Sequence, residues 1–262
     1  MRTDRWHALL AVALLAAGFA AACETVPYTG RSQLQLMSPQ QESELGAQAY
    51  QQTLSKAKLS SDSAASEMVT RVGSRIAAAT GHPEYKWEYR LIQDDKQVNA
   101  FALPGGKVAV YTGILPITKD ENGLAAVLGH EIGHVIARHG GERVSQQMLV
   151  NVGLETTMAA LSKGNPATVQ AIASLLGAGA TVGVLLPWSR AQESEADHLG
   201  LILMAKAGYD PHASRDLWVR MAAAPGASGK PPEFLSTHPS DPTRIRQIEG
   251  WMPEAMQYYR PR

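Results

Sequence analysis

Two histidines lie four residues apart in the string His130-Glu131-Ile132-Gly133-His134, and no other pair of the chain's eight histidines has this spacing. Four residues turn about 400° around a helix, so both imidazole rings leave one helix face and can bind the same metal ion. Glu131 lies beside that face, where a carboxylate can accept a proton from a water that the metal polarises. A surface helix with incidental histidines is the alternative. The apolar flanking residues argue against it, because an unpaired polar pair in a buried helix is costly.

A catalytic zinc site requires a third protein ligand and one open position. The nearest further histidine, His139, lies five residues beyond His134 and therefore about 140° off the shared face. We expect His139 at the surface or beside the helix C-terminal dipole. Because the chain has a single cysteine, the remaining option is a carboxylate from a second helix.

Two candidate carboxylates, Glu193 and Glu195, lie on a helix predicted downstream. They are two residues apart and leave nearly opposite faces, so only one can face the metal. Glu193 shares a face with Asp197 one turn away, which would let Glu193 bind the metal while Asp197 accepts the ring N–H of a ligand histidine. Glu195 falls among positions typical of solvent contact. The alternative for the whole acidic cluster is a solvated helix face.

Hydrophobic periodicity places the histidine string on a helix. Apolar residues recur at steps of three and four from Asp120 until Gly140-Gly141, where we expect the helix to end. Glycines inside this run weaken a helix, so we expect them to permit close packing: Gly123, Gly129 and Gly133. Further helices are predicted over 38–57, 63–80, 142–161, 188–207, 211–224 and 240–250.

One small sheet is predicted between these helices. Alternating apolar residues from Trp87 to Leu91 favour a strand, and residues 98–103 and 107–111 flank Pro104-Gly105-Gly106 as a hairpin. Many helices with one small sheet indicate an α+β fold. An extended substrate could add as a strand along Asn99, Ala100 and Phe101.

The N-terminal residues predict an export signal. Arg2 and Arg5 precede an uncharged, largely apolar run, Ala8–Ala22, that ends directly before Cys23. The run is shorter than the roughly 20 residues of a bilayer span, although an uncleaved anchor helix is the alternative. We expect a signal peptide at 1–22, a lipid on Cys23, a tether over 23–37 and a single domain over 38–262.

Composition narrows the function classes. Basic and acidic residues balance at 24 each, which argues against a basic nucleic-acid binder. One cysteine excludes an internal disulfide and a Cys-rich zinc module. The uncharged stretch 174–188 is broken by glycine and proline; buried core, a flap over a cleft and a membrane-dipping edge are all compatible with it.

The string 130–134 and the later pattern Ser189-Arg190-x-x-Glu193-x-x-Ala196-Asp197 resemble the HExxH zinc metallopeptidase family that includes HtpX, the CAAX prenyl protease and the lipoproteins BepA and LoiP. Residues 99–106 and 29–34 resemble its periplasmic lipoprotein branch. The resemblance implies a helix-rich, zincin-like domain with one Zn²⁺ per chain. Its ligands would be His130, His134 and Glu193, with Glu131 as general base.

The resemblance also implies an activity and a place. It suggests a zinc endopeptidase that hydrolyses unfolded or misassembled envelope proteins at the periplasmic face of the outer membrane of a Gram-negative bacterium, held there by the N-terminal lipid. The runner-up function is a lipoprotein chaperone or assembly factor with a closed or structural metal site. Glu131 argues against that function, because a structural zinc needs no base.

His238, with Arg244 six residues later, resembles a C-terminal element that approaches the metal in this family. These side chains could hold the oxyanion of a tetrahedral intermediate. Alternatively, His238 could bind the metal itself in a closed, inactive state. A helix N-terminal turn with an incidental histidine and a surface arginine is the third possibility.

Overall fold

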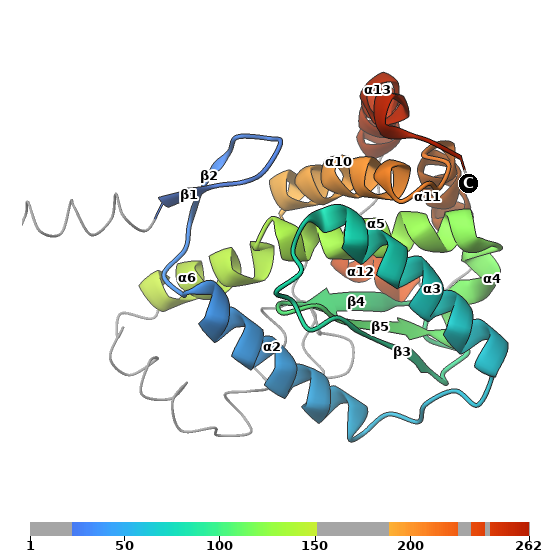
Figure 1. Cartoon of the computed structure of the whole chain (residues 1–262), viewed down its shortest axis with the longest axis horizontal. Coiled ribbons are helices and arrows are strands. Elements are labelled where there is room, and N and C mark those ends of the chain that lie inside the picture. Colours follow the sequence, from blue (N-terminus) through green and yellow to red (C-terminus); the bar gives the residue numbers. More distant parts are fainter. Residues whose placement is uncertain (1–22, 151–188, 225–231, 239–241, 262) are drawn as a thin grey trace, which may run out of the picture.

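The computed structural model describes residues 23–150, 189–224, 232–238 and 242–261. The predicted signal peptide (1–22) and the uncharged stretch 174–188 lie outside these ranges. Within them, helices pack around a three-stranded sheet (Figure 1), which confirms the expected helix-rich α+β class. None of the described helices is both long enough and apolar enough to cross a membrane.

The sheet has the strand order β3-β5-β4. β4 (Ala100–Leu103) and β5 (Lys107–Tyr111) form the predicted antiparallel hairpin. Its turn contains Gly105 and Gly106, whose φ angles of 78° and 84° lie in the left-handed region that favours glycine. β3 (Glu88–Ile92) pairs parallel with β5. β4 is therefore an edge strand of this sheet.

Helices cover both faces of the sheet, so β4 and β5 are buried along their whole length. One face packs against α3 (Ser63–Thr80) and α5 (Glu121–Ile136), and the other against α2 (Pro39–Leu54) and α6 (His139–Val150). The first face carries Ala100, Ala102, Val108 and Val110; the second carries Phe101, Leu103, Ala109 and Tyr111. Burial on both faces explains why these strands are continuous apolar runs in the sequence.

α5 is the central helix, and every residue from Gly123 to Ile136 is buried. α10 (Arg190–Lys206) lies along it (Figure 1), and the two backbones meet at Gly129 and Gly200. A Cβ on Gly200 would lie 2.7 Å from the Gly129 carbonyl carbon, closer than real contacts allow. The predicted close packing at the α5 glycines is thus confirmed. α11 (His212–Ala223) and α13 (Pro242–Tyr258) complete this layer.

Several helix ends differ from prediction. α5 ends before the glycine pair, because Arg138 adopts a left-handed backbone (φ 56°) and α6 begins at His139. Arg138 is held there by donating to the Glu42 carboxylate and the Met37 carbonyl. α13 continues beyond its predicted end at residue 250, since Ala255 still packs into the core. Three short elements were not predicted: η1 (Thr112–Ile114), α4 (Leu115–Thr118) and α12 (Glu233–Thr237).

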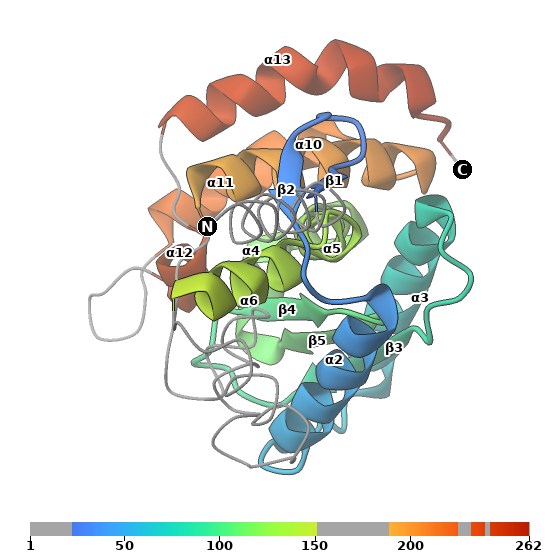
Figure 2. The same cartoon turned by 90° about the vertical axis from the view of Figure 1, so that its left-hand side faces the viewer.

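Residues 23–37, expected to be a tether, fold onto the domain, and we call them the N-terminal arm. β1 (Cys23–Thr25) pairs antiparallel with β2 (Ser32–Leu34). Val26 is buried against Ala137, which directly follows α5, and against Leu199 of α10. Figures 1 and 2 show this hairpin beside α10 and the junction of α5 with α6.

Candidate metal centre

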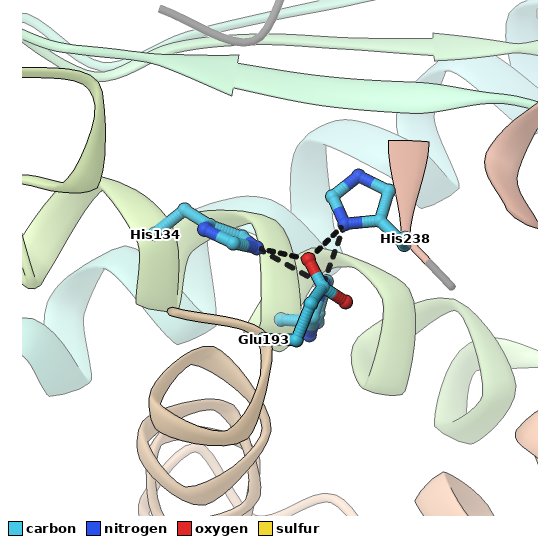
Figure 3. A group of neighbouring side chains, drawn as sticks. His134, Glu193 and His238 are labelled. Atoms are coloured by element: carbon cyan, nitrogen blue, oxygen red, sulfur yellow. Dashed lines mark hydrogen bonds and ion pairs between the residues drawn. The ribbon is translucent and has the colours of Figure 1, made fainter. Parts of the chain in front are cut away.

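Four buried side chains, three from two helices and one from the residue after a third, converge beside the sheet. His130 and His134 extend from α5, Glu193 extends from the first turn of α10, and His238 directly follows α12. Their donor atoms all lie within 4.8 Å of one another. Figure 3 shows His134, Glu193 and His238 pointing toward a common centre. The structure thus brings together the three side chains that the sequence suggested as ligands and His238, which the sequence offered as a metal donor in a closed state.

Four of the distances between these donor atoms are close to those in a zinc coordination shell. His134 Nε2 is 3.2 Å from His130 Nε2 and 3.3 Å from Glu193 Oε1. His238 Nδ1 is 2.9 Å from Glu193 Oε1 and 3.0 Å from His130 Nε2. Four ligands about 2.0–2.1 Å from a tetrahedral zinc ion are roughly 3.3 Å from one another. The residues present therefore fit a zinc ion.

The protonation of the α5 histidines supports this fit. His130 Nδ1 lies 2.8 Å from Asp197 Oδ1. An ionised carboxylate can only accept, so Nδ1 carries the ring proton and Nε2 presents a lone pair to the centre. Burial holds the pKa of His130 and of His134 well below the usual value, so both rings are neutral. The His130 lone pair and a Glu193 oxygen therefore lie in the same centre, an arrangement that a divalent cation stabilises.

Local sequence fixes Glu193 at the start of α10. Ser189 caps the helix: its Oγ accepts from the Gln192 N–H, and the Gln192 side chain accepts from the Ser189 N–H. Glu193 consequently lies in the first turn, where the helix dipole favours a carboxylate. Burial acts to raise the pKa of Glu193, but the charges of His238 and Arg244 outweigh it and hold that pKa well below its usual value.

Arg244 is buried and bound to two carboxylates of α10. Its Nη1 lies 2.7 Å from Glu193 Oε2, its Nη2 donates to Asp197 Oδ1 at 2.7 Å, and its guanidinium stacks 3.3 Å above the Trp218 ring. These contacts exclude the surface arginine that was one possibility. They engage the guanidinium fork with Glu193 and Asp197, so these two carboxylates hold Arg244 in place.

Glu131 faces the same space from the neighbouring position on α5. Its Oε1 is 3.3 Å from His238 Nε2 and accepts no hydrogen bond from the described residues. Burial raises the pKa of Glu131 to about 7, with His238 and a backbone hydrogen bond from Ala102 opposing the rise. A buried carboxylate with one oxygen available is suited to accept and release a proton.

Two further residues lie behind His134: Glu195, which the sequence placed at the surface, and His139, expected at the surface or beside the helix C-terminal dipole. His139 is fully buried; its Nδ1 is 2.8 Å from His134 Nδ1, and its Nε2 is 3.1 Å from Glu195 Oε2. Glu195 is 6% exposed. The surface expectation was wrong for both. The chain turns at Arg138 and returns His139 beside His134, and the N-terminal arm covers Glu195. A helical projection that treats the sequence as one uninterrupted helix shows neither the turn at Arg138 nor the cover provided by the arm.

The residues suggested as a substrate strand lie at the sheet edge beside α5. Ala100 and Phe101 belong to β4, and Asn99 precedes it. The Phe101 side chain is buried in the core on the face opposite α5, so it cannot contact a substrate, and an added strand would have to pair through the backbone. Ala102 already uses its backbone to contact Glu131. The edge strand and the carboxylate are thus in direct contact.

Comparison with known proteins gives a consistent result. Residues 63–252 match the model of peptidase family M48. The chain is 43% identical over 88% of its length to the mitochondrial metalloendopeptidase OMA1 of Schizosaccharomyces pombe, covering 67% of that protein. It is 30% identical to human metalloendopeptidase OMA1 over 98% of its own length and 52% of the relative. It is also 30% identical to the β-barrel assembly-enhancing protease of Yersinia pestis, over 87% of its length and 47% of the relative. The chain thus spans about half the length of the last two relatives.

Proposed function

The chain belongs to peptidase family M48, and from this membership we propose that it is a zinc-dependent endopeptidase acting on unfolded or misassembled polypeptides. One observation carries the proposal: four buried donors lie within 4.8 Å of one another beside Glu131, a carboxylate with one oxygen that accepts no hydrogen bond from the described residues. A purely structural site has no use for that adjacent carboxylate. The named activities of the relatives, metalloendopeptidase and protease, agree with it.

The proposed ligands are His130, His134 and Glu193. A zinc ion in this position supplies a Lewis acid that polarises the scissile carbonyl and acidifies a water. Asp197 holds the His130 ring through its Nδ1–H, and Arg244 joins Asp197 to Glu193, so the ligand side chains are fixed before substrate arrives. Such preorganisation removes a reorganisation cost from the reaction.

Glu131 is proposed as the general base. Its Oε1 lies 3.3 Å from His238 Nε2 and accepts no hydrogen bond from the described residues. Once His238 has moved away, this oxygen can accept the proton of a water placed there and then deliver that proton to the leaving amine. Its burial excludes bulk water, and its pKa of about 7 lets the same group take and return the proton near neutrality. The contact with Ala102 fixes the carboxylate beside the edge strand on which a substrate would lie.

His238 occupies the fourth donor position, and we assign this arrangement to a closed state. Its Nδ1 is 2.9 Å from Glu193 and its Nε2 is 3.3 Å from Glu131. The ring therefore fills the space that a water and a peptide carbonyl would need. Turnover would require His238 to move away, whereupon it could become a donor to the oxyanion.

The closed arrangement also favours the second candidate function, a chaperone or assembly factor whose site stays shut. Replacing Glu131 with Gln separates the two. A chaperone that does not cleave would retain its full biological activity in the variant, whereas an endopeptidase would lose it.

The proposed location is the periplasmic face of the outer membrane, with the chain anchored by a lipid on Cys23. The support is the signal-like run ending at Cys23 and the similarity to a β-barrel assembly-enhancing protease. Other relatives are named mitochondrial. Metabolic labelling with a fatty acid should mark the parent and leave the Cys23→Ala chain unlabelled. Equal labelling of both chains would show that Cys23 does not carry the lipid.

The test of the enzymatic proposal is casein cleavage by the purified full chain, with zinc content measured on the same sample. Glu131→Gln keeps the side-chain shape and all zinc donors, so it should bind as much zinc as the parent and melt at a similar temperature. Its cleavage rate should fall by about 10²–10⁴-fold. Cleavage at the parental rate would show that Glu131 is not the base.

A further inference from the structure

The N-terminal arm reaches the metal centre through one arginine. Arg31 Nε donates to both oxygens of Glu195 at 2.8 Å, and Nη1 and Nη2 donate to the two oxygens of Glu142 at 2.6 and 2.7 Å. Glu195 belongs to α10 and Glu142 to α6, so a single guanidinium joins two helices. Thr29 adds a hydrogen bond from its hydroxyl to Glu195 Oε1 at 2.9 Å.

From Glu195 the contacts continue to His134. Glu195 Oε2 is 3.1 Å from His139 Nε2, and His139 Nδ1 is 2.8 Å from His134 Nδ1. Only one proton arrangement of two neutral rings leaves His134 Nε2 unprotonated, as a metal ligand must be. His134 donates its Nδ1–H to His139 Nδ1, and His139 donates its Nε2–H to the Glu195 carboxylate. These hydrogen bonds all donate in the same direction, from His134 through His139 to Glu195. Arg31 binds the Glu195 carboxylate at the end of this series.

The arm also binds the backbone at the end of α5, one turn beyond His134. The Gln33 side-chain amide donates to the Ala137 carbonyl at 2.8 Å, and the Gln35 amide donates to the Arg138 carbonyl at 2.9 Å. The Ala137 carbonyl stands where α5 stops, and the Arg138 carbonyl also accepts the Glu142 N–H at the start of α6. The arm therefore fixes the helix end that carries His134 as well as the side chain behind it.

We propose that Arg31 is a positioning residue of the metal centre, acting through Glu195 and His139 on the orientation of the metal ligand His134. This rests on the proposed function, because His134 is assigned there as a zinc ligand. Arginine suits the position because its planar fork binds Glu142 and its Nε binds Glu195, which a lysine ammonium cannot do together. Without it, two buried carboxylates would lose their cation, and Glu195 would no longer be fixed behind His139.

The experiment measures zinc affinity of the purified full chain by competition with a chromogenic chelator, which requires no cleavage. Groups that orient zinc-bound histidines typically contribute 10- to 100-fold in affinity, so Arg31→Gln should weaken zinc binding by that factor. Arg31→Lys keeps the charge but loses the fork and should fall between Arg31→Gln and the parent. Arg71→Gln is the matched control, because Arg71 also pairs with a glutamate but lies on the exposed face of α3, and its affinity should be unchanged.

A double-variant cycle distinguishes positioning from general loosening of the arm. In this series of hydrogen bonds, Arg31 acts on His139 only through Glu195. If His139 is already replaced by leucine, the further change Arg31→Gln should therefore cause little additional loss of zinc affinity. Losses that multiply in the double variant would overturn the proposal. So would parental affinity in a folded Arg31→Gln chain.

Two further comparisons keep the result interpretable. If Arg31→Gln fails to fold by circular dichroism, Thr29→Val removes one hydrogen bond from the same Glu195 oxygen and should still give a measurable, smaller loss. Parental affinity in Thr29→Val and Arg31→Lys together would then overturn the role. A parent that binds zinc but cleaves nothing contradicts the proposed function alone. Equal zinc affinity in parent and variants contradicts the positioning role alone.

Discussion

At the residue scale, each histidine of the α5 pair is held by a different partner. His130 donates directly to Asp197, whereas His134 reaches its carboxylate, Glu195, only through His139. A carboxylate behind a ligand ring fixes the tautomer and raises the basicity of the nitrogen that faces the metal. The two rings end on different carboxylates, Asp197 and Glu195, so they can be perturbed separately.

Asp197→Asn tests the direct hydrogen bond between His130 and Asp197. The amide keeps the shape of the carboxylate but loses its charge, so it should weaken zinc binding by about 10- to 100-fold while the Glu131 position is unaffected. Chelator competition measures the affinity, and circular dichroism confirms the fold. Undiminished affinity in a folded Asp197→Asn chain would show that the orientation of His130 does not depend on this contact.

The sequence predicted the residues of the centre better than their neighbours. His130, His134 and Glu193 follow from helical spacing, because each lies on a regular helix whose period the sequence displays. His139 and Glu195 do not, because their burial depends on the left-handed backbone at Arg138 and on an arm from a distant part of the chain. Helical spacing carries no information about either.

At the element scale, the centre depends on where α10 begins. The capping box at Ser189 fixes the first turn, and Glu193 lies in that turn. Further along, Gly129 and Gly200 let α5 and α10 approach until their backbones touch. The start of one helix and the crossing of two thus set the distance between Glu193 and the α5 histidines.

Ser189→Ala should destabilise the chain by about 1 kcal/mol and also weaken zinc binding, because the first turn of α10 frays. Ser38→Ala is the matched control. Ser38 forms the same capping box at α2, which carries no donor of the centre. We expect both variants to lose similar stability in urea unfolding and only Ser189→Ala to lose zinc affinity. An equal loss of affinity in both would assign the effect to general stability.

The elements were predictable to different degrees. The caps of α2 and α3, the hairpin β4–β5 and the α5 glycines all have local causes that the sequence displays. The parallel pairing of β3 with β5 and the folding of the N-terminal arm onto the domain do not, since both depend on contacts between distant segments. The short helix α12, which delivers His238, also lacks a periodic signal because it has only five residues.

At the scale of the whole molecule, the centre joins segments from most of the described chain. The arm, α5, α10 and the residue after α12 all meet there. A bound ion therefore ties together parts of the chain that the sheet and the main core hold only indirectly. Zinc should stabilise the entire fold rather than one loop.

This predicts a large shift of the melting temperature on metal removal. With free zinc at about 100 times its dissociation constant, binding to the folded state alone adds about 2.7 kcal/mol. For a domain of this size that corresponds to a rise of roughly 5–10 °C. Differential scanning calorimetry with zinc and after chelation measures it, and magnesium serves as the control ion. Identical melting with and without zinc would indicate that the fold does not bind the ion through this centre.

The most direct measurement is anomalous diffraction at the zinc edge from crystals of the purified full chain. One peak is predicted about 2.0–2.1 Å from His130 Nε2, His134 Nε2 and a Glu193 oxygen. His238 should either complete that shell or have moved away to admit water. No peak among these residues, or a zinc ion held elsewhere in the chain, would contradict the assignment of this centre as the zinc site of a metallopeptidase.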